Sequence, residues 1–256
     1  MASTSTTTGI ERIAEAFARA RSEGRRAALM PYMMGGFPSL ELSRQIAVAY
    51  ARSGADIVEL GIPFSDPLAD GPVIHAAATA ALRAGATLER VLELAGAIAE
   101  NDIPVVVMCY CNPVLARGYE RFADALVRAG ASGLIVPDLP MEEASELRSV
   151  CDQHGLALVP LVAPTTPAGR LAQIGAIARG FLYAVAVTGT TGERSGLDAA
   201  LVARAAAHSS VPVALGFGIS SAGQAAAAAD AGADGVIIGS RLVRAAGEAD
   251  DPVAAV

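Results

Sequence analysis

The sequence contains no tryptophan and no lysine, and only 18 % of its 256 residues are charged. All positive charge is therefore carried by arginine, which argues against an aldolase that forms an imine through a lysine amine. The formal net charge is −7, and the chain has no basic run. Nucleic acid and anionic membrane surfaces are therefore poor partners, which leaves a small molecule or another protein.

Cysteine and histidine are also scarce. Cys109, Cys111 and Cys151 are the cysteines, and so few thiols in a chain of this length are typical of a reducing compartment, so we expect a cytoplasmic protein. The histidines are isolated, and the pair Cys109 and Cys111 is interpreted as core filler on an apolar strand. We therefore expect neither a metal nor a cofactor.

Long apolar runs and interdomain linkers are absent as well. The sequence has no stretch of ~20 apolar residues, so it predicts no membrane span. The tract from Met1 to Gly9 is rich in Ser and Thr and lacks the apolar region of a signal peptide, so we expect residues 1–9 to be disordered. Because no linker divides the remainder, residues 10–256 are predicted to form a single barrel domain.

Short β-rich runs alternate along the chain with longer, Ala-rich runs of helical spacing. The eight runs are Leu29 to Met33, Asp56 to Leu60, Val105 to Tyr110, Leu134 to Val136, Leu156 to Val162, Phe181 to Val187, Val213 to Gly216 and Val236 to Gly239. This order predicts an α/β fold, a (β/α)₈ TIM barrel, with an extra N-terminal helix from Ile10 to Glu23 over the barrel floor. A doubly wound open sheet is the competing fold, but no Gly-x-Gly-x-x-Gly turn follows the first strand.

A weak internal repeat supports the barrel. Gly54-Ala-Asp, Gly130-Ala-Ser and Gly232-Ala-Asp each lie between a helical run and a buried strand. Gly54, Gly130 and Gly232 are therefore predicted to end their helices in the left-handed conformation.

Carboxylates lie where a barrel has its active site, at the carboxyl ends of the strands. Glu59 belongs to an otherwise apolar strand, where burial raises a carboxyl pKa towards the range useful for acid–base chemistry. A strand-end acid paired with a neighbouring arginine is the alternative. Asp66 and Asp70 follow in a loop rich in proline and glycine. They are either further site residues or residues that form turns and helix caps.

Glycine-rich segments follow the last three predicted strands: Gly189 to Gly192, Gly216 to Gly218, and Gly239-Ser240. Glycine backbone N–H groups and a helix N-terminus together form a typical phosphate site, and barrels often carry one at the seventh and eighth strands. The alternative is that these glycines serve only turns.

The run from Glu59 to Pro72 closely resembles a motif of the tryptophan synthase alpha chain family. The resemblance continues through Asn112-Pro113, Gly133 to Pro140, Tyr183, Gly189 to Gly192, Gly216 to Ser220 and Gly239-Ser240, and so spans almost the whole chain. The chain departs from the usual family pattern at Phe37, Thr190 and Cys111.

The resemblance implies retro-aldol cleavage of indole-3-glycerol phosphate to indole and D-glyceraldehyde 3-phosphate, without metal or cofactor. Glu59 matches the catalytic acid and base, and Asp70 matches the carboxylate that binds the indole N–H. The residues implied to bind the rest of the substrate are Tyr32, Tyr110, Ile135, Val162, Tyr183, Thr191 and Phe217. Those implied to bind phosphate are Gly192, Gly218, Gly239 and Ser240.

The resemblance also implies a partner, a pyridoxal-phosphate-dependent β subunit in an α₂β₂ heterotetramer. Pro63, Asp66 and Asn112 match regions that face it. Residues 188–196 match a loop that closes over substrate, which would make Arg194 sensitive to protease. Three alternatives stay open: a stand-alone lyase that releases free indole, a non-catalytic activator of a β-type partner, and a phosphosugar isomerase.

Overall fold

The computed structural model describes residues 7–185, 199–216 and 218–256 of the chain. Its strands are β1 (Ala28–Met34), β2 (Val58–Gly61), β3 (Val105–Met108), β4 (Gly133–Ile135), β5 (Ala157–Leu158), β6 (Leu161–Val162), β7 (Leu182–Val185), β8 (Val213–Gly216) and β9 (Gly235–Ile238). Its helices are α1 (Gly9–Ser22), α2 (Leu40–Arg52), α3 (Pro72–Arg83), α4 (Leu88–Ala99), α5 (Cys111–Arg117), α6 (Tyr119–Arg128), α7 (Ser145–Gln153), α8 (Ala168–Ile177), α9 (Ala199–Ala206), α10 (Ala222–Asp230) and α11 (Ser240–Glu248).

The strands form one parallel sheet in the order β5-β4-β3-β2-β1-β9-β8-β7-β6. The two end strands, β5 and β6, are halves of the single predicted run from Leu156 to Val162. Val159 N–H donates to Leu134 on one side, and Tyr183 N–H donates to Pro160 on the other. The run therefore closes the sheet, and the predicted (β/α)₈ barrel is confirmed with one strand divided beside Pro160.

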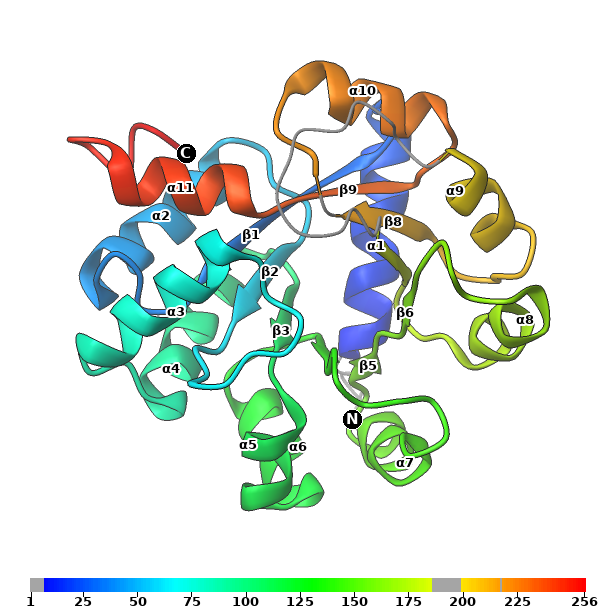
Figure 1. Cartoon of the computed structure of the whole chain (residues 1–256), viewed down its shortest axis with the longest axis horizontal. Helices are drawn as coiled ribbons and strands as arrows, with labels where there is room; N and C mark the ends of the chain where they lie inside the picture. The colour runs from blue at the N-terminus through cyan, green and yellow to red at the C-terminus, as the bar shows by residue number, and fades with distance from the viewer. Residues whose placement is uncertain (1–6, 186–198, 217) are drawn as a thin grey trace, which may run out of the picture.

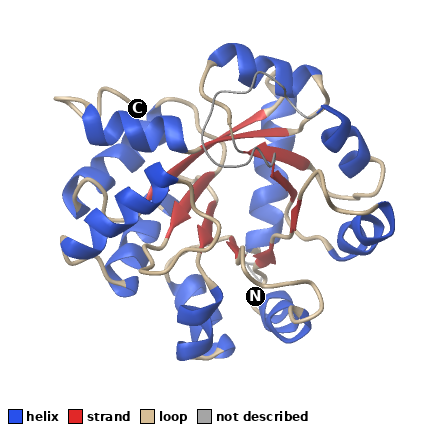
Figure 2. Cartoon of the chain, in the orientation of Figure 1, coloured by secondary structure: helices blue, strands red, loops and turns tan. Residues whose placement is uncertain are grey.

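Helices surround the strands, and α1 lies across one end of the barrel (Figures 1 and 2). Ile13 and Phe17 of α1 are fully buried in a cluster with Met30, Ile57 and Phe181, which lie near the amino ends of their strands. Burying both α1 side chains contributes roughly 1.5–3 kcal/mol each. The predicted helix over the barrel floor is therefore confirmed.

The repeated Gly-Ala motif ends three helices in the same way. Gly54, Gly130 and Gly232 have φ values of 84°, 71° and 95°. In each case the following alanine N–H donates to the carbonyl five residues back, as Ala55 does to Tyr50. This is the Schellman arrangement, which satisfies helix carbonyls that would otherwise lack partners.

The aspartates of the repeat hold the floor of the barrel together. Asp56 accepts the Leu29 N–H at 2.8 Å and binds Arg25 through both carboxylate oxygens. Asp234 accepts the Val213 N–H at 2.9 Å. Each aspartate therefore joins the start of its own strand to the start of the neighbouring strand.

The end of the tract predicted to be disordered, Thr8 and Gly9, belongs to the start of α1. Thr8 caps α1, because its hydroxyl accepts the Glu11 N–H and the Glu11 carboxylate accepts the Thr8 N–H. Gly9 is the first helical residue. This reciprocal capping box orders the end of the tract, and residues 1–6 lie outside the described part of the chain. In that described part, no helix has the length and apolar character needed to cross a bilayer.

Candidate active site

Glu59 lies inside the barrel wall with no partner for its carboxylate. It pairs in register with Tyr32 of β1 and Val106 of β3, and its exposed fraction is 1 %. Among the described residues neither carboxylate oxygen has a hydrogen-bonding partner. The alternative of a strand-end acid paired with arginine therefore does not describe Glu59.

Burial decides the protonation state of Glu59. Loss of hydration, and to a smaller extent the negative charge of Asp70, raises the pKa of Glu59 from its ordinary value of 4.5 to about 8. A group with this pKa is mostly protonated at neutral pH, yet it can lose and regain its proton at little cost. Glu59 therefore has the properties of a general acid that can act next as a base.

Asp70 reaches the site from the loop between β2 and α3. Its Oδ1 accepts a hydrogen bond from the Tyr110 hydroxyl at 2.9 Å, and the same hydroxyl oxygen accepts the Ala69 N–H at 3.0 Å. Tyr110 in turn stacks on Phe64, with ring centroids 5.3 Å apart. One tyrosine thus fixes both the loop backbone and the Asp70 carboxylate.

The electrostatic environment of Asp70 differs from that of Glu59. Partial burial raises the pKa of Asp70, whereas the Tyr110 hydrogen bond and the charge of His75 act in the opposite direction. The predicted alternative for Asp70, a helix cap, is not observed, because α3 begins after Gly71 and has no side-chain cap. Asp66 is exposed and hydrogen-bonds to Ser65.

Two buried tyrosines lie beside Glu59, and each rests on a glycine. A Cβ atom added to Gly61 would lie 2.2 Å from the Tyr32 hydroxyl, and one added to Gly216 would lie 2.3 Å from the Tyr183 ring. Burial is the main cause that raises the pKa of both phenols, and the charge of Glu59 adds to it. The two phenols are therefore neutral, and these glycines leave space that any other residue would fill.

The inner face also carries Ile135, which packs in the same cluster as Tyr183 and Val106. Val162 does not belong to this face. Leu161 pairs with Tyr183 and packs against the inner cluster, whereas Val162 packs with Leu171 of α8 on the helix side. Because strand side chains alternate between faces, the predicted pocket position of Val162 is corrected to Leu161.

Part of the predicted phosphate site lies in the described residues. Gly239 is the N-cap of α11, and Ser240 is its first, exposed residue at the carboxyl end of β9. A Cβ added to Gly239 would lie 3.7 Å from Tyr32, whereas Gly218 has φ +80° and open space around it. Thr191, Gly192, Phe217, Arg194 and the predicted loop 188–196 lie outside the described residues.

Two of the residues predicted to face a partner lie in the loop after β2, and the third lies on α5. Asp66 and Asn112 are exposed, whereas Pro63 is buried. Sequence reasoning missed Leu68 and Leu115, whose exposed fractions are 84 % and 56 %. Such exposure is unusual for leucine. The sequence indicated a functional position only for Leu68, which lies within the motif from Glu59 to Pro72.

Sequence reasoning also missed Asp138, which follows β4. Its Oδ1 accepts the Cys111 N–H at 2.8 Å and so anchors the start of α5, next to Tyr110. No group of three or more His, Cys, Asp or Glu side chains in the described ranges is arranged to hold a metal ion.

A model of the family described as "Tryptophan synthase alpha chain" matches residues 17–255. The chain belongs to the tryptophan synthase alpha chain family. Among relatives in the family, the alpha chain of Synechococcus elongatus is 50 % identical over 235 residues, which cover 90 % of this chain and 88 % of that one. The alpha chain of Methanosarcina mazei is 46 % identical over 243 residues, which cover 94 % and 88 %.

Solved structures of the family have the same fold. A structure of Mycobacterium tuberculosis tryptophan synthase is similar with a TM-score of 0.88 and 42 % identity, over 94 % of this chain and 93 % of that chain. The tryptophan synthase a2b2 complex of Pyrococcus furiosus contains a chain with a TM-score of 0.84 and 34 % identity, over 88 % and 92 %. The family consists of lyases of tryptophan biosynthesis, so this chain is a lyase on the same barrel.

Proposed function

We propose that this chain is the α subunit of a tryptophan synthase and cleaves the carbon–carbon bond of indole-3-glycerol phosphate. The products are indole and D-glyceraldehyde 3-phosphate. The observation that carries the proposal is Glu59, a buried carboxyl with a pKa near 8, no partner for either oxygen, and the charge of Asp70 close enough to affect its pKa. This is the pair of carboxyl groups that cleavage without a Schiff base needs.

The steps follow from the different environments of the two acids. Glu59 gives its proton to indole C3, and the ring becomes a cationic indolenine. Asp70 accepts a hydrogen bond from the ring N–H and stabilises the positive charge there. The bond between C3 and the glycerol carbon then breaks, its electrons return to the ring, and the ionised Glu59 takes the proton of the carbonyl-forming hydroxyl.

The other proposed binding residues surround this pair. Tyr32, Tyr183, Ile135 and Leu161 support the aromatic ring and the glycerol chain from the inner face, together with Tyr110 beside Asp70. Gly218, Gly239 and Ser240 are proposed to hold the phosphate, because the N-terminus of α11 offers free backbone N–H groups and a positive dipole end. Thr191, Gly192 and Phe217 complete the proposed substrate site.

The proposed partner is a pyridoxal-phosphate-dependent β subunit, in an α₂β₂ assembly like that named for Pyrococcus furiosus. Exposed Leu68 and Leu115 support this proposal, because large exposed apolar side chains near a catalytic loop are typical of an interface. Asp66, Asn112 and Pro63 belong to the same region. The proposed compartment is the cytoplasm, where Cys109 and Cys151 stay buried thiols.

The test is indole release from indole-3-glycerol phosphate by the purified chain, alone and with a tryptophan synthase β subunit. We expect slow release that rises strongly with β and is lost in Glu59→Gln and Asp70→Asn. Glu93→Gln, an exposed carboxylate on α4, is the matched control and should keep full activity. Full activity without β would instead support a stand-alone lyase, and activity of Glu59→Gln equal to the parent would contradict the proposed chemistry.

A further inference from the structure

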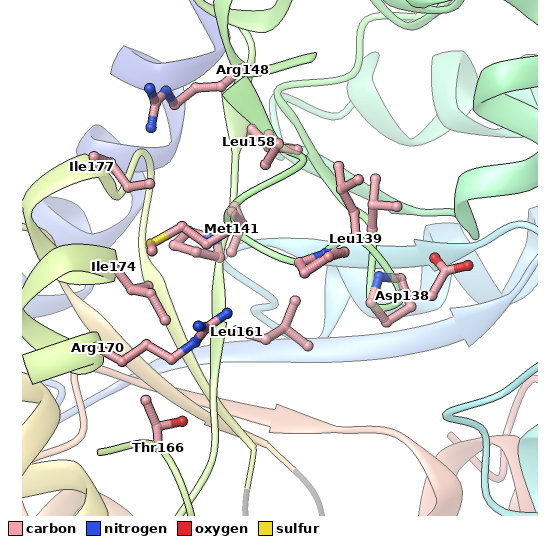
Figure 3. Close-up of a pocket in the computed structure, with 16 residues that line it drawn as sticks. Asp138, Leu139, Met141, Arg148, Leu158, Leu161, Thr166, Arg170, Ile174 and Ile177 are labelled. Atoms are coloured by element: carbon pink, nitrogen blue, oxygen red, sulfur yellow. The ribbon is translucent and has the colours of Figure 1, made fainter. Parts of the chain in front are cut away.

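A cavity lies between α7, α8 and the segment that joins β4 to α7 (Figure 3). Its volume is about 340 Å³, near the lower end of the range of small-molecule sites. The apolar part of its lining includes Met141, Leu158, Ile174 and Ile177. This lining suits an apolar body of one ring or a short chain.

Two guanidinium groups lie at the cavity, and they differ in their partners. Arg170 is held by Glu142 through two hydrogen bonds, at 2.6 and 2.8 Å, which link α8 to the segment before α7. Arg148 extends from α7 towards Ile177 of α8 (Figure 3). Within the described ranges the Arg148 side chain has no hydrogen bond or ion pair, although its backbone N–H donates to Ala144. It is therefore the uncompensated positive charge of the cavity.

The acidic group of the lining does not neutralise Arg148. Asp138 is on the other side of the cavity in Figure 3, and its carboxylate is occupied by the Cys111 N–H. Arg148 can therefore bind an anion through two parallel N–H donors, which is the geometry that guanidinium offers to a carboxylate. Arg170 already makes such a pair with Glu142, at 2.6 and 2.8 Å.

We propose that this cavity is a binding site for a small apolar monocarboxylate, with its carboxylate on Arg148 and its apolar body between α8 and Met141. The site lies outside the barrel interior that holds Glu59. Leu161 is shared, because it lines the cavity and also packs against the inner cluster. The proposal does not depend on the reaction at Glu59, and binding can be measured without turnover.

The test is calorimetric titration of the full chain with 3-phenylpropanoate and with its neutral analogue, 3-phenylpropanamide. We expect the acid to bind at least about tenfold more tightly than the amide, the effect of a charge-assisted hydrogen bond. Arg148→Gln should remove that preference and leave amide binding unchanged. Arg128→Gln, an exposed arginine of α6, is the matched control and should change neither affinity.

Two further variants separate this cavity from the barrel interior. Ile177→Trp places a ring in the cavity from a partly exposed position, so it should abolish binding of both compounds. Glu59→Gln should leave both affinities unchanged. Equal affinity for acid and amide, binding that survives Arg148→Gln and Ile177→Trp, or no binding at millimolar concentration would each overturn the proposal, whatever the outcome of the indole assay.

Discussion

Asp56 lies two residues before β2 and Glu59 lies within β2, both 1 % exposed, and they differ in every contact that they make. Asp56, at the floor, binds Arg25 with both oxygens and accepts the Leu29 N–H. Glu59, at the mouth, has no partner for either oxygen in the described part of the chain. Two equally buried carboxylates therefore have opposite roles.

The difference shows that one buried carboxylate of the barrel serves stability, whereas the other is suited to catalysis. A buried carboxylate with a full set of partners holds neighbouring strands together. One without partners takes up a proton, at a cost to stability that the rest of the fold must offset. Locally unfavourable residues of this kind are expected at functional sites.

The largest expected effect comes from Glu59→Gln. Removing a general acid costs about 10²- to 10⁴-fold in rate, and the amide has similar size, so the fold should persist. The measurement is kcat for indole release, with circular dichroism as the check on folding. Asp56→Asn, measured in parallel, should keep its kcat if Asp56 acts only on stability. Equal losses of kcat in the two variants would contradict separate roles for Asp56 and Glu59.

Asp56→Ala should mainly reduce stability. It leaves the Arg25 guanidinium and the Leu29 N–H without their partner, which costs on the order of 3 kcal/mol in the free energy of unfolding. Asp230→Ala is the matched control, because its ion pair with Arg26 is exposed at 63 % and 59 % and contributes at most about 1 kcal/mol. Urea unfolding measures both, and equal losses would contradict a special role for Asp56.

Glu59 should make the free energy of unfolding depend on pH. Between pH 4.5 and 8 the folded chain holds a proton on Glu59 that the unfolded chain has released. The free energy of unfolding therefore falls as pH rises through this window, by up to ~1.4 kcal/mol per pH unit. Unfolding at pH 5 and pH 8 should show this fall in the parent and a smaller one in Glu59→Gln. An identical fall in both would contradict the raised pKa.

The smallest expected effect is that of Tyr110→Phe. It removes the hydroxyl that binds Asp70 and Ala69 but keeps the ring on Phe64. Loss of one such hydrogen bond predicts about a tenfold fall in kcat/KM. Tyr119→Phe, on α6 away from the site, should be neutral. A Tyr110→Phe chain with parental kcat/KM would show that the loop holds Asp70 without this bond.

Most of the fold could be predicted from periodicity and glycine placement. The eight β-rich runs and the glycine ends at 54, 130 and 232 were correct, because buried parallel strands and left-handed helix ends each need particular residues. The division of the run from Leu156 to Val162 was not predicted. Pro160 lacks an N–H to donate, and only the closed sheet shows that its neighbours pair with different strands.

The site was predicted less evenly. Glu59 could be identified because a carboxylate in an apolar strand is rare. Val162 was assigned to the wrong face because both faces of a barrel strand are apolar, so the sequence lacks the alternation that would set the register. Asp138 and the free guanidinium of Arg148 depend on contacts between segments distant in the chain, which no local pattern encodes.

The most direct test of the account is the pKa of Glu59 itself, measured by the ¹³C chemical shift of its carboxyl carbon between pH 4 and pH 9, with Glu59→Gln to assign the signal. The account predicts a titration near 8, the value that burial without a partner gives. A titration near the ordinary value of 4.5 would show that Glu59 is hydrated or paired in solution, and would contradict its role as the acid.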